Sequence, residues 1–404
     1  PFIFGLVGIL SFAPFSIKLL IFISYSYLIY ILISDHKNLL FKIFLWGIGH
    51  WGFGMSWIIV SVYYYGDTAI ATTFLIYILL VCTLSIVFTC PIILIKKLLN
   101  LINIKNNLYK TLLISSLFML SELSRYHLLN GVPWLIPGNI YLDTITQDIY
   151  SVLGVSGASI LIYLISSNLV ILYNQTRFFY MIILLSIISI IPNHKSENTS
   201  DGIKVSIIQP SSDPFLKYKA NYDYEIEQNL LNLLQKTSKD TNLIVLPEAE
   251  LPYALDNPRF NSFIKNVPQS EKVIMGVWNI EQNKLYNSIY NVKNGDLYKK
   301  KHLVPFGEYI PFIESIRGLI SFFNLPMSNV THGNENQNNI HILNDIKVAT
   351  PICFDITFTE TIRKMNKSSL LMINISNDTW FGNSIGPHHH LEIARIRSIE
   401  NNRW

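Results

Sequence analysis

Three segments in the second half of the sequence carry side chains that together could perform acyl transfer. Cys353 follows one apolar stretch, and Glu248 follows another, Asn242–Leu246. Sheets of α/β proteins gather active-site groups just beyond the ends of their strands. A lysine triplet, Lys299–Lys301, precedes Glu308 in a short, turn-rich stretch. A thiol needs a base to become a good nucleophile, and an acyl-transfer intermediate needs a cation or donor at its oxyanion, so these residue types supply the required parts.

Each segment taken alone also has a more ordinary explanation. A single cysteine at the end of a strand is more often structural, and an exposed lysine triplet is usually a solvated face. Residues 193–404 contain no second cysteine that could pair with Cys353, so the pattern predicts no disulfide there. If Cys353 begins a helix, we expect the helix N-terminus to favour its thiolate form.

The hydrophobic pattern around these residues predicts alternating strands and helices. We expect strands at 204–209, 242–246, 271–278, 285–292, 346–352 and 369–375, and helices at 219–236, 258–266, 357–366 and from about 387. This alternation indicates an α/β domain with layered sheets. The segment 312–330 is unusually apolar, which leaves core packing and a lid that touches lipid as alternatives.

The composition divides the chain into two parts. Half of all residues are apolar and 14% are charged, whereas soluble proteins carry about a quarter charged residues. Residues 1–192 hold 14 charged side chains and residues 193–404 hold 44. We therefore expect a membrane region at 1–192 and a soluble domain at 193–404. This composition excludes an intrinsically disordered chain, a nucleic-acid binder and a disulfide scaffold.

The first part contains about seven apolar segments that we expect to be membrane helices, of which the first is partial and the last is short of the roughly 20 residues of a span. They lie at 1–13, 17–34, 39–61, 69–95, 111–129, 151–173 and 178–192. Most basic residues of this part fall in alternate loops, which predicts that those loops are cytoplasmic and that residues from about 193 onward are extracytoplasmic. The chain begins at Pro1 in an apolar run and stops at Trp404 in a predicted helix, so we expect a piece cut at both ends.

Several motifs closely resemble those of the bacterial apolipoprotein N-acyltransferases, the membrane branch of the carbon–nitrogen hydrolase (nitrilase) superfamily. The most specific is the string His-Leu-Val-Pro-Phe-Gly-Glu at 302–308. The resemblance covers essentially the whole chain, at Trp46–Trp57, Gly131–Asn139, Pro247–Pro252, Tyr298–Tyr309, Pro351–Asp355 and Ile375–Pro387. It implies a polytopic α-helical membrane region joined to a four-layer α/β/β/α nitrilase-like sandwich, with further strands and a membrane helix beyond Trp404.

The resemblance also implies the catalytic residues and the reaction. The family's Glu–Lys–Cys triad matches Glu248, Lys300 and Cys353, and Glu308 matches a second carboxylate that helps to hold the lysine. The implied reaction moves the sn-1 acyl chain of a phospholipid to the cysteine as a thioester. The chain then passes to the α-amino group of the S-diacylglyceryl-cysteine of an apolipoprotein. The implied location is the bacterial inner membrane, with the catalytic domain on the periplasmic side, and the implied state is a monomer.

The sequence departs from the family pattern around the predicted substrate-binding residues. Phe354 and Asp355 stand where members commonly have Tyr-Glu, and Tyr218 stands where a tryptophan is usual. Trp380 follows the pattern, and either lipid contact or core packing would explain it. His388–His390 resembles a metal cluster, but consecutive side chains on a helix do not converge. We therefore expect no metal and no cofactor.

Two other functions remain as alternatives. A membrane-tethered amidase of the nitrilase type would resolve the thioester with water, although a soluble amide would not require the apolar segment 312–330. A non-catalytic scaffold or transporter is the other alternative. Transporters usually show charged or broken helices at the membrane midplane. The predicted membrane segments contain few ionisable residues, which favours the enzyme.

Overall fold

The structure is a computed structural model that describes residues 1–34, 37–65, 68–102, 104–193, 202–214, 216–219, 222–305, 307–309, 329–343 and 346–403. It divides into two compact units. The helical unit comprises Pro1–Ile59, Ala71–Ser196 and Asn383–Asn402, and the α/β unit comprises Val60–Ile70, Glu197–Gly382 and Arg403–Trp404. The helix that follows the Trp380 motif thus belongs to the helical unit. The domain boundary at 192/193 stays a prediction.

All seven predicted membrane segments contain helix. The helices of this part are α1 (Phe2–Ile9), α2 (Leu20–Ile33), α3 (Leu39–Gly54), α4 (Trp57–Val60), α5 (Ile70–Leu84), α6 (Ile93–Ile102), α7 (Asn107–Ser124), α8 (Ile149–Ile171) and α9 (Thr176–Ser189). Short π and 3-10 turns, Ser85–Thr89 and Cys90–Ile92, join α5 to α6.

The sequence predicts about seven membrane helices, but fewer of the described helices are long enough to cross a membrane. Within the described residues, Ile70–Ile102 and Ile149–Ile171 meet the requirements of length and apolar composition. Leu39–Gly54 and Trp57–Tyr64 are bent by 52° and would count as a third span only if taken together. The apolar helices α2 and α9 have 14 residues each, about six short of a typical span.

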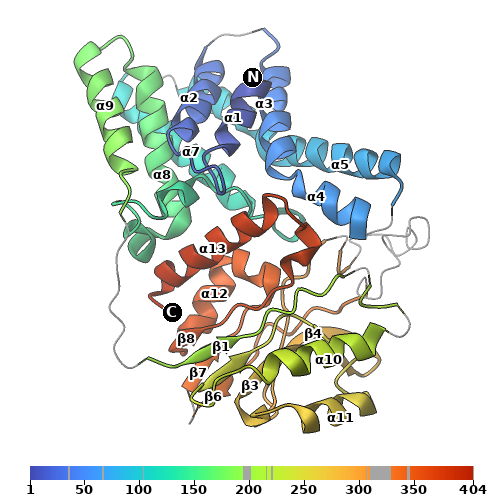
Figure 1. Cartoon of the computed structure of the whole chain (residues 1–404). Helices are drawn as coiled ribbons and strands as arrows, with labels where there is room; N and C mark the ends of the chain where they lie inside the picture. Colours follow the sequence, from blue (N-terminus) through green and yellow to red (C-terminus); the bar gives the residue numbers. More distant parts are fainter. Residues whose placement is uncertain are drawn as a thin grey trace. The chain divides into compact units, whose positions relative to one another are not determined.

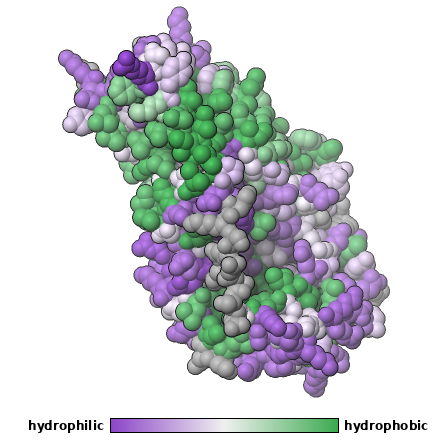
Figure 2. Space-filling model, turned by 60° about the vertical axis from the view of Figure 1, so that its left-hand side comes forward, coloured by the Kyte–Doolittle hydropathy of each residue, from purple (hydrophilic) through white to green (hydrophobic). Residues whose placement is uncertain are grey.

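Apolar side chains cover much of the outer surface of the helical unit. On α9, Phe178, Met181, Leu184 and Leu185 are about half exposed. Figure 2 shows apolar side chains gathered over this part of the chain. A soluble protein rarely exposes such a continuous apolar surface, whereas lipid tails would cover it.

The α/β unit contains two sheets. One has five strands in the order β1-β2-β3-β4-β5, and the other has three in the order β6-β7-β8. The strands are β1 (Val205–Ile207), β2 (Leu243–Val245), β3 (Val273–Glu281), β4 (Lys284–Asn291), β5 (Leu297–Lys299), β6 (Ile340–Ile342), β7 (Ile346–Ala349) and β8 (Leu371–Met372). The β1-β2-β3 and β7-β8 pairs are parallel, and the other pairs are antiparallel.

Helices pack against these sheets and close the core. Helices α10 (Tyr222–Leu234) and α11 (Pro258–Asn266) cover the five-stranded sheet, as Figure 1 shows. Leu230 and Phe260 on these helices lie in one apolar cluster with Ile244 and Met275 of the sheet. Helix α12 (Thr359–Asn366) packs against β7. The fold is the nitrilase-type α/β sandwich joined to a helical membrane region that the sequence predicts.

Most predicted elements of the α/β unit form near their predicted positions. The main differences are β5 and β6, two three-residue strands that the hydrophobic pattern did not indicate. The predicted terminal helix is α13 (Gly386–Asn401). Most of the apolar segment 312–330 lies outside the described residues, so the choice between core packing and a lid stays open.

Candidate active site

Glu248 lies immediately beyond β2, in a segment that is pressed against β3. The Gly276 amide of β3 donates to the carbonyl of Pro247 at 3.1 Å. A Cβ at Gly276 would lie 2.6 Å from the Cα of Glu248 and 2.3 Å from the Ala249 nitrogen. Only glycine permits two backbones to approach this closely. The glycine therefore fixes where the Glu248 carboxylate lies relative to the sheet.

Lys300 follows β5 and carries its ammonium into the interior. Its amide donates to the carbonyl of Asn287 at 2.7 Å, which continues the pairing of β5 with β4. The side chain is 1% exposed and its Nζ lies 3.0 Å from Glu248 Oε1 and 2.9 Å from Glu308 Oε1. One buried cation thus bridges two buried carboxylates. Lys299 and Lys301 instead form ion pairs with exposed carboxylates.

Asn287 belongs to the same cluster, although the sequence did not single it out. Its Nδ2 donates to Oε1 of Glu248 at 2.7 Å and to Oε1 of Glu308 at 3.1 Å. The second oxygen of Glu308 accepts from the Val304 amide at 2.8 Å. Asparagine is depleted in strands, so its presence within the predicted strand 285–292 was the one available signal of a special position.

Cys353 begins a short 3-10 helix, η9 (Cys353–Thr357), at the end of the β7 segment. Its backbone amide donates to the carbonyl of Ile375 at 2.7 Å, and its φ is 46°. A non-glycine residue in this left-handed region is uncommon, and such conformations cluster at active sites. The side chain is partly exposed. Cys353 is therefore held in a fixed, unusual backbone conformation.

Electrostatics keep the thiol protonated, contrary to the prediction that a helix N-terminus favours its thiolate. Burial and the negative charge of Glu248 raise the pKa of Cys353 well above its usual range, although Lys300 opposes them. A five-residue 3-10 helix provides too small a dipole to reverse these effects. Burial alone would lower the pKa of Lys300, but the carboxylates of Glu248 and Glu308 help to raise it well above its usual range. The resting site is thus a thiol beside a firmly charged ammonium.

Asp355 holds the cysteine loop in place. The side chain is fully buried, and burial raises its pKa to about 6, against the effect of backbone donors. Oδ1 accepts from the His302 amide at 2.7 Å, and Oδ2 accepts from the Ile352 amide and the Tyr298 hydroxyl, both at 3.2 Å. This burial does not support the predicted substrate contact for Asp355. Its bonds instead tie η9 to the strand that carries Lys300.

The other predicted substrate-binding residues lie on three separate segments of the α/β unit. The Phe354 ring packs edge-on against Phe358, with centroids 5.3 Å apart. The Tyr218 hydroxyl accepts from Trp278 Nε1 at 3.2 Å, and Tyr218 lines a cavity of about 260 Å³. Trp380 lies half-buried in the 3-10 helix Asp378–Phe381. Their substrate contacts stay predictions.

The histidine triplet lies near the N-terminus of α13, within the helix. His389 and His390 are buried, and the Trp134 indole donates to His389 Nδ1 at 3.2 Å. Among the described residues, no group of three or more potential metal ligands has the geometry to hold an ion. The rings of His389 and His390 both lie against the Trp134 ring, with centroids 6.2 and 6.3 Å from it.

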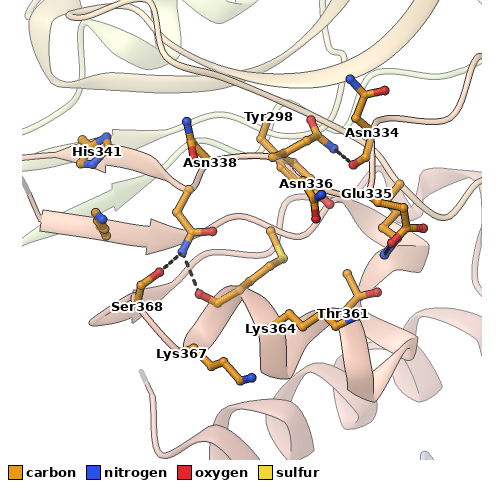
Figure 3. A pocket seen from close by; sticks show the side chains of 15 residues that line it. Tyr298, Asn334, Glu335, Asn336, Asn338, His341, Thr361, Lys364, Lys367 and Ser368 are labelled. Carbon is orange, nitrogen blue, oxygen red and sulfur yellow. Dashed lines mark hydrogen bonds and ion pairs between the residues drawn. The ribbon is translucent and has the colours of Figure 1, made fainter.

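A larger cavity of about 610 Å³ lies between the β6-β7 hairpin and α12. Figure 3 shows its lining of lysine, asparagine and serine side chains, which includes Lys364 and Thr361 from α12. Asn339 Nδ2 donates to the carbonyl of Met365 at 2.7 Å across one of its edges. Glu248, Lys300 and Cys353 do not line it. Such polar walls do not suit an acyl chain, so this cavity is not the candidate active site.

The close approach at Gly276 gives a first prediction. We expect Gly276→Ala to displace the Glu248 segment, to lower the acylation rate by about 10²-fold and to destabilise the unit by about 1–3 kcal/mol. A Cβ at Gly202 would meet nothing within 4 Å, so Gly202→Ala is the matched control. Steady-state transfer rates and thermal unfolding measure both effects. A Gly276→Ala variant with wild-type activity would show that the position of Glu248 does not matter.

Family models match both parts of the chain. Residues 4–168 match the apolipoprotein N-acyltransferase N-terminal domain, and residues 204–404 match the carbon-nitrogen hydrolase domain. The first of these matches is confined to the helical part. The second covers the segments that carry Glu248, Lys300 and Cys353.

Named relatives align with nearly the whole chain. The chain is 30% identical to an apolipoprotein N-acyltransferase of Haemophilus influenzae, over 98% of this chain and 80% of the relative. It is 29% identical to the one of Pasteurella multocida, with the same coverage. Among solved structures, Nit3 of Saccharomyces cerevisiae, a member of the nitrilase superfamily, covers 50% of this chain and 73% of its own, at 23% identity and a TM-score of 0.34.

Proposed function

This chain belongs to the apolipoprotein N-acyltransferase family, and we propose that Cys353, Glu248 and Lys300 carry out its acyl transfer. The chain is an acyltransferase that N-acylates lipoproteins, with phospholipid as the acyl donor. The single observation that carries the assignment of the residues is the buried Glu248–Lys300–Glu308 cluster. The charges of Glu248 and Lys300 in this cluster act in opposite directions on the pKa of Cys353, a partly exposed residue.

In the first half-reaction, the Cys353 sulfur attacks the sn-1 ester carbonyl of a phospholipid. Because the resting group is a thiol, Glu248 must take its proton as the attack proceeds. Glu248 Oε1 already accepts from Lys300 and Asn287, whereas Oε2 accepts one amide, that of Asn377 at 3.0 Å. Oε2 therefore has the capacity to receive the proton.

Lys300 stabilises the oxyanion that develops on the ester oxygen. Its ammonium stays charged because the surrounding carboxylates raise its pKa, and it is held in place before the substrate arrives. Collapse of the tetrahedral intermediate breaks the ester C–O bond. Glu248 returns the proton to the departing lysophospholipid oxygen, which leaves the acyl chain on Cys353 as a thioester.

In the second half-reaction, the α-amine of an S-diacylglyceryl-cysteine attacks the thioester. Glu248 accepts a proton from the amine, the C–S bond breaks, and the proton returns to the Cys353 sulfur. The products are an N-acylated lipoprotein and the resting thiol. Each half-reaction forms one oxyanion and passes one proton through Glu248. The same base and the same cation can therefore serve both half-reactions.

The chain is membrane-associated, and we propose that it lies in the inner membrane with its α/β unit on the periplasmic side. The basic residues of the first 192 support this orientation, because they cluster in alternate loops. We propose further that the enzyme acts as a monomer. Hydrolysis of an amide by the same residues remains the alternative activity. The full-length similarity to named acyltransferases favours transfer.

Intact mass spectrometry tests the proposed thioester. We expect incubation of the detergent-solubilised protein with phospholipid micelles, without acceptor, to add the mass of one acyl chain. Neutral hydroxylamine should remove the adduct, and a diacylglyceryl-cysteine peptide should discharge it with formation of an amide. Discharge by water at the same rate as by the peptide would favour the amidase. A folded protein that forms no adduct would contradict the proposed mechanism.

A further inference from the structure

A buried lysine lies next to the segment that carries the proposed base. Lys217 is 2% exposed, and its Nζ donates to the carbonyl of Ala249, the residue that follows Glu248. Removing an ammonium group from water is unfavourable unless charges and hydrogen bonds replace the lost hydration. The described mechanism does not use Lys217, so its burial has no explanation in the chemistry of Cys353 and Lys300.

The charges around Lys217 come from the same segment. Glu250 is 2% exposed, and both Glu250 and Glu248 interact favourably with the Lys217 ammonium. Within the described part of the chain, Glu250 Oε1 has no hydrogen-bond partner, so the lysine is the main compensation for its charge. The Tyr218 ring faces the ammonium with its centroid 5.6 Å from Nζ. Lys217 is thus surrounded by two carboxylates, a carbonyl and an aromatic face.

The backbone that Lys217 contacts is in an unfavourable conformation. Ala249 has a φ of 41°, in the left-handed region that residues with a Cβ rarely adopt. Such a conformation persists only where its surroundings hold it. Gly276 supports this segment from the side of β3, and the Lys217 ammonium holds the Ala249 carbonyl. Together they fix the direction in which Glu248 leaves the main chain.

We propose that Lys217 is a positioning residue for acyl transfer, which clamps the Glu248–Glu250 turn so that the Glu248 carboxylate stays aimed at Lys300 and Asn287. The inference rests on the proposed role of Glu248 as the base. Lys217 itself does not contact the reacting atoms. Its positive charge matters because it holds a carbonyl dipole and the Glu250 carboxylate at once.

The clamp has its own dependence on pH. Burial lowers the pKa of Lys217 to about 8, although Glu250 and Glu248 oppose that shift. The charged form is present below this pH and is lost as the pH rises through it. The pKa values of Lys300 and Cys353 are instead raised well above their usual ranges, so neither titrates near pH 8. We therefore expect acylation by the wild-type enzyme to slow above about pH 8.

The test measures the rate of thioester formation from phospholipid between pH 6 and 10, by quenched-flow mass spectrometry. We expect Lys217→Met to lower the maximal rate at pH 7 by about tenfold or more, because the base is misplaced. The phospholipid concentration that gives the half-maximal rate should not change. The decline above pH 8 should disappear. Lys219→Met, an exposed lysine two residues away, should behave as the wild type.

A second variant shifts the titration of Lys217 and does not remove it. Glu250→Gln removes a negative charge that holds the proton on Lys217, so we expect the alkaline decline to shift to lower pH. This variant decides the question if Lys217→Met does not fold. A Lys217→Met enzyme that keeps the wild-type rate, or that keeps the decline near pH 8, would overturn the proposal, as would an unshifted decline in Glu250→Gln.

Glu248→Gln separates this inference from the proposed function. If Glu248→Gln forms no thioester while the wild type does, the base is established whatever the Lys217 variants show. If Glu248→Gln acylates at the wild-type rate, both the proposed base and the role of Lys217 are wrong.

Discussion

Replacing Cys353 with alanine is expected to abolish the acyl adduct and to reduce lipoprotein N-acylation by on the order of 10⁴-fold or more. The thiol is the proposed covalent carrier, and within the described residues the two other cysteines lie in the helical unit. The fold should tolerate the change, because Cys353 contributes its left-handed backbone and a partly exposed side chain. Intact mass and a transfer assay with a diacylglyceryl peptide measure both losses.

Three comparisons make this result specific. Cys82→Ala and Cys90→Ala should form the adduct at the wild-type rate, since both lie on the α5–α6 stretch. Cys353→Ser retains a weaker nucleophile, so we expect slow formation of an ester that neutral hydroxylamine removes far less readily than a thioester. Adduct formation by Cys353→Ala would place the carrier on another residue and would contradict the proposed mechanism.

The sequence was sufficient to predict the strands that precede Glu248 and Cys353, but not β5, which precedes Lys300. Strands β2 and β3 form near their predicted positions, and Glu248 follows β2 as the pattern indicates. The reason is that a buried strand bounded by a proline produces a clear local signal. The selection of Lys300 within its triplet depended on the family motif. The structure shows a physical difference, because Lys299 and Lys301 pair with exposed carboxylates.

Other features of the site had no local signal. Asn287 lies beside Lys300 because β4 and β5 pair in one register, and register is a property of the folded sheet. The burial of Lys217 likewise depends on a turn 32 residues away. The raised pKa of Cys353 follows from its burial and from the charge of Glu248, and neither can be read from the start of a helix alone.

Replacing Lys300 with methionine is expected to damage both catalysis and folding. Loss of the proposed oxyanion cation should lower the acylation rate by about 10²–10³-fold. The same change leaves two buried carboxylates facing one another, since Oε1 of Glu248 and Oε1 of Glu308 both lie about 3 Å from Nζ. Removing one partner of a buried ion pair costs about 3–5 kcal/mol of unfolding free energy.

A double variant separates these two effects. Lys300→Met combined with Glu308→Gln removes one of the two negative charges, and Asn287 Nδ2 can still donate to Glu248. We expect thermal unfolding of this double variant to recover most of the stability lost by Lys300→Met, with little recovery of the acylation rate. Recovery of both would mean that Lys300 serves only to balance charge. If only the stability recovers, the fold is intact and Glu248 is still present. The remaining loss of rate then shows that the chemistry itself needs a cation at the position of Nζ.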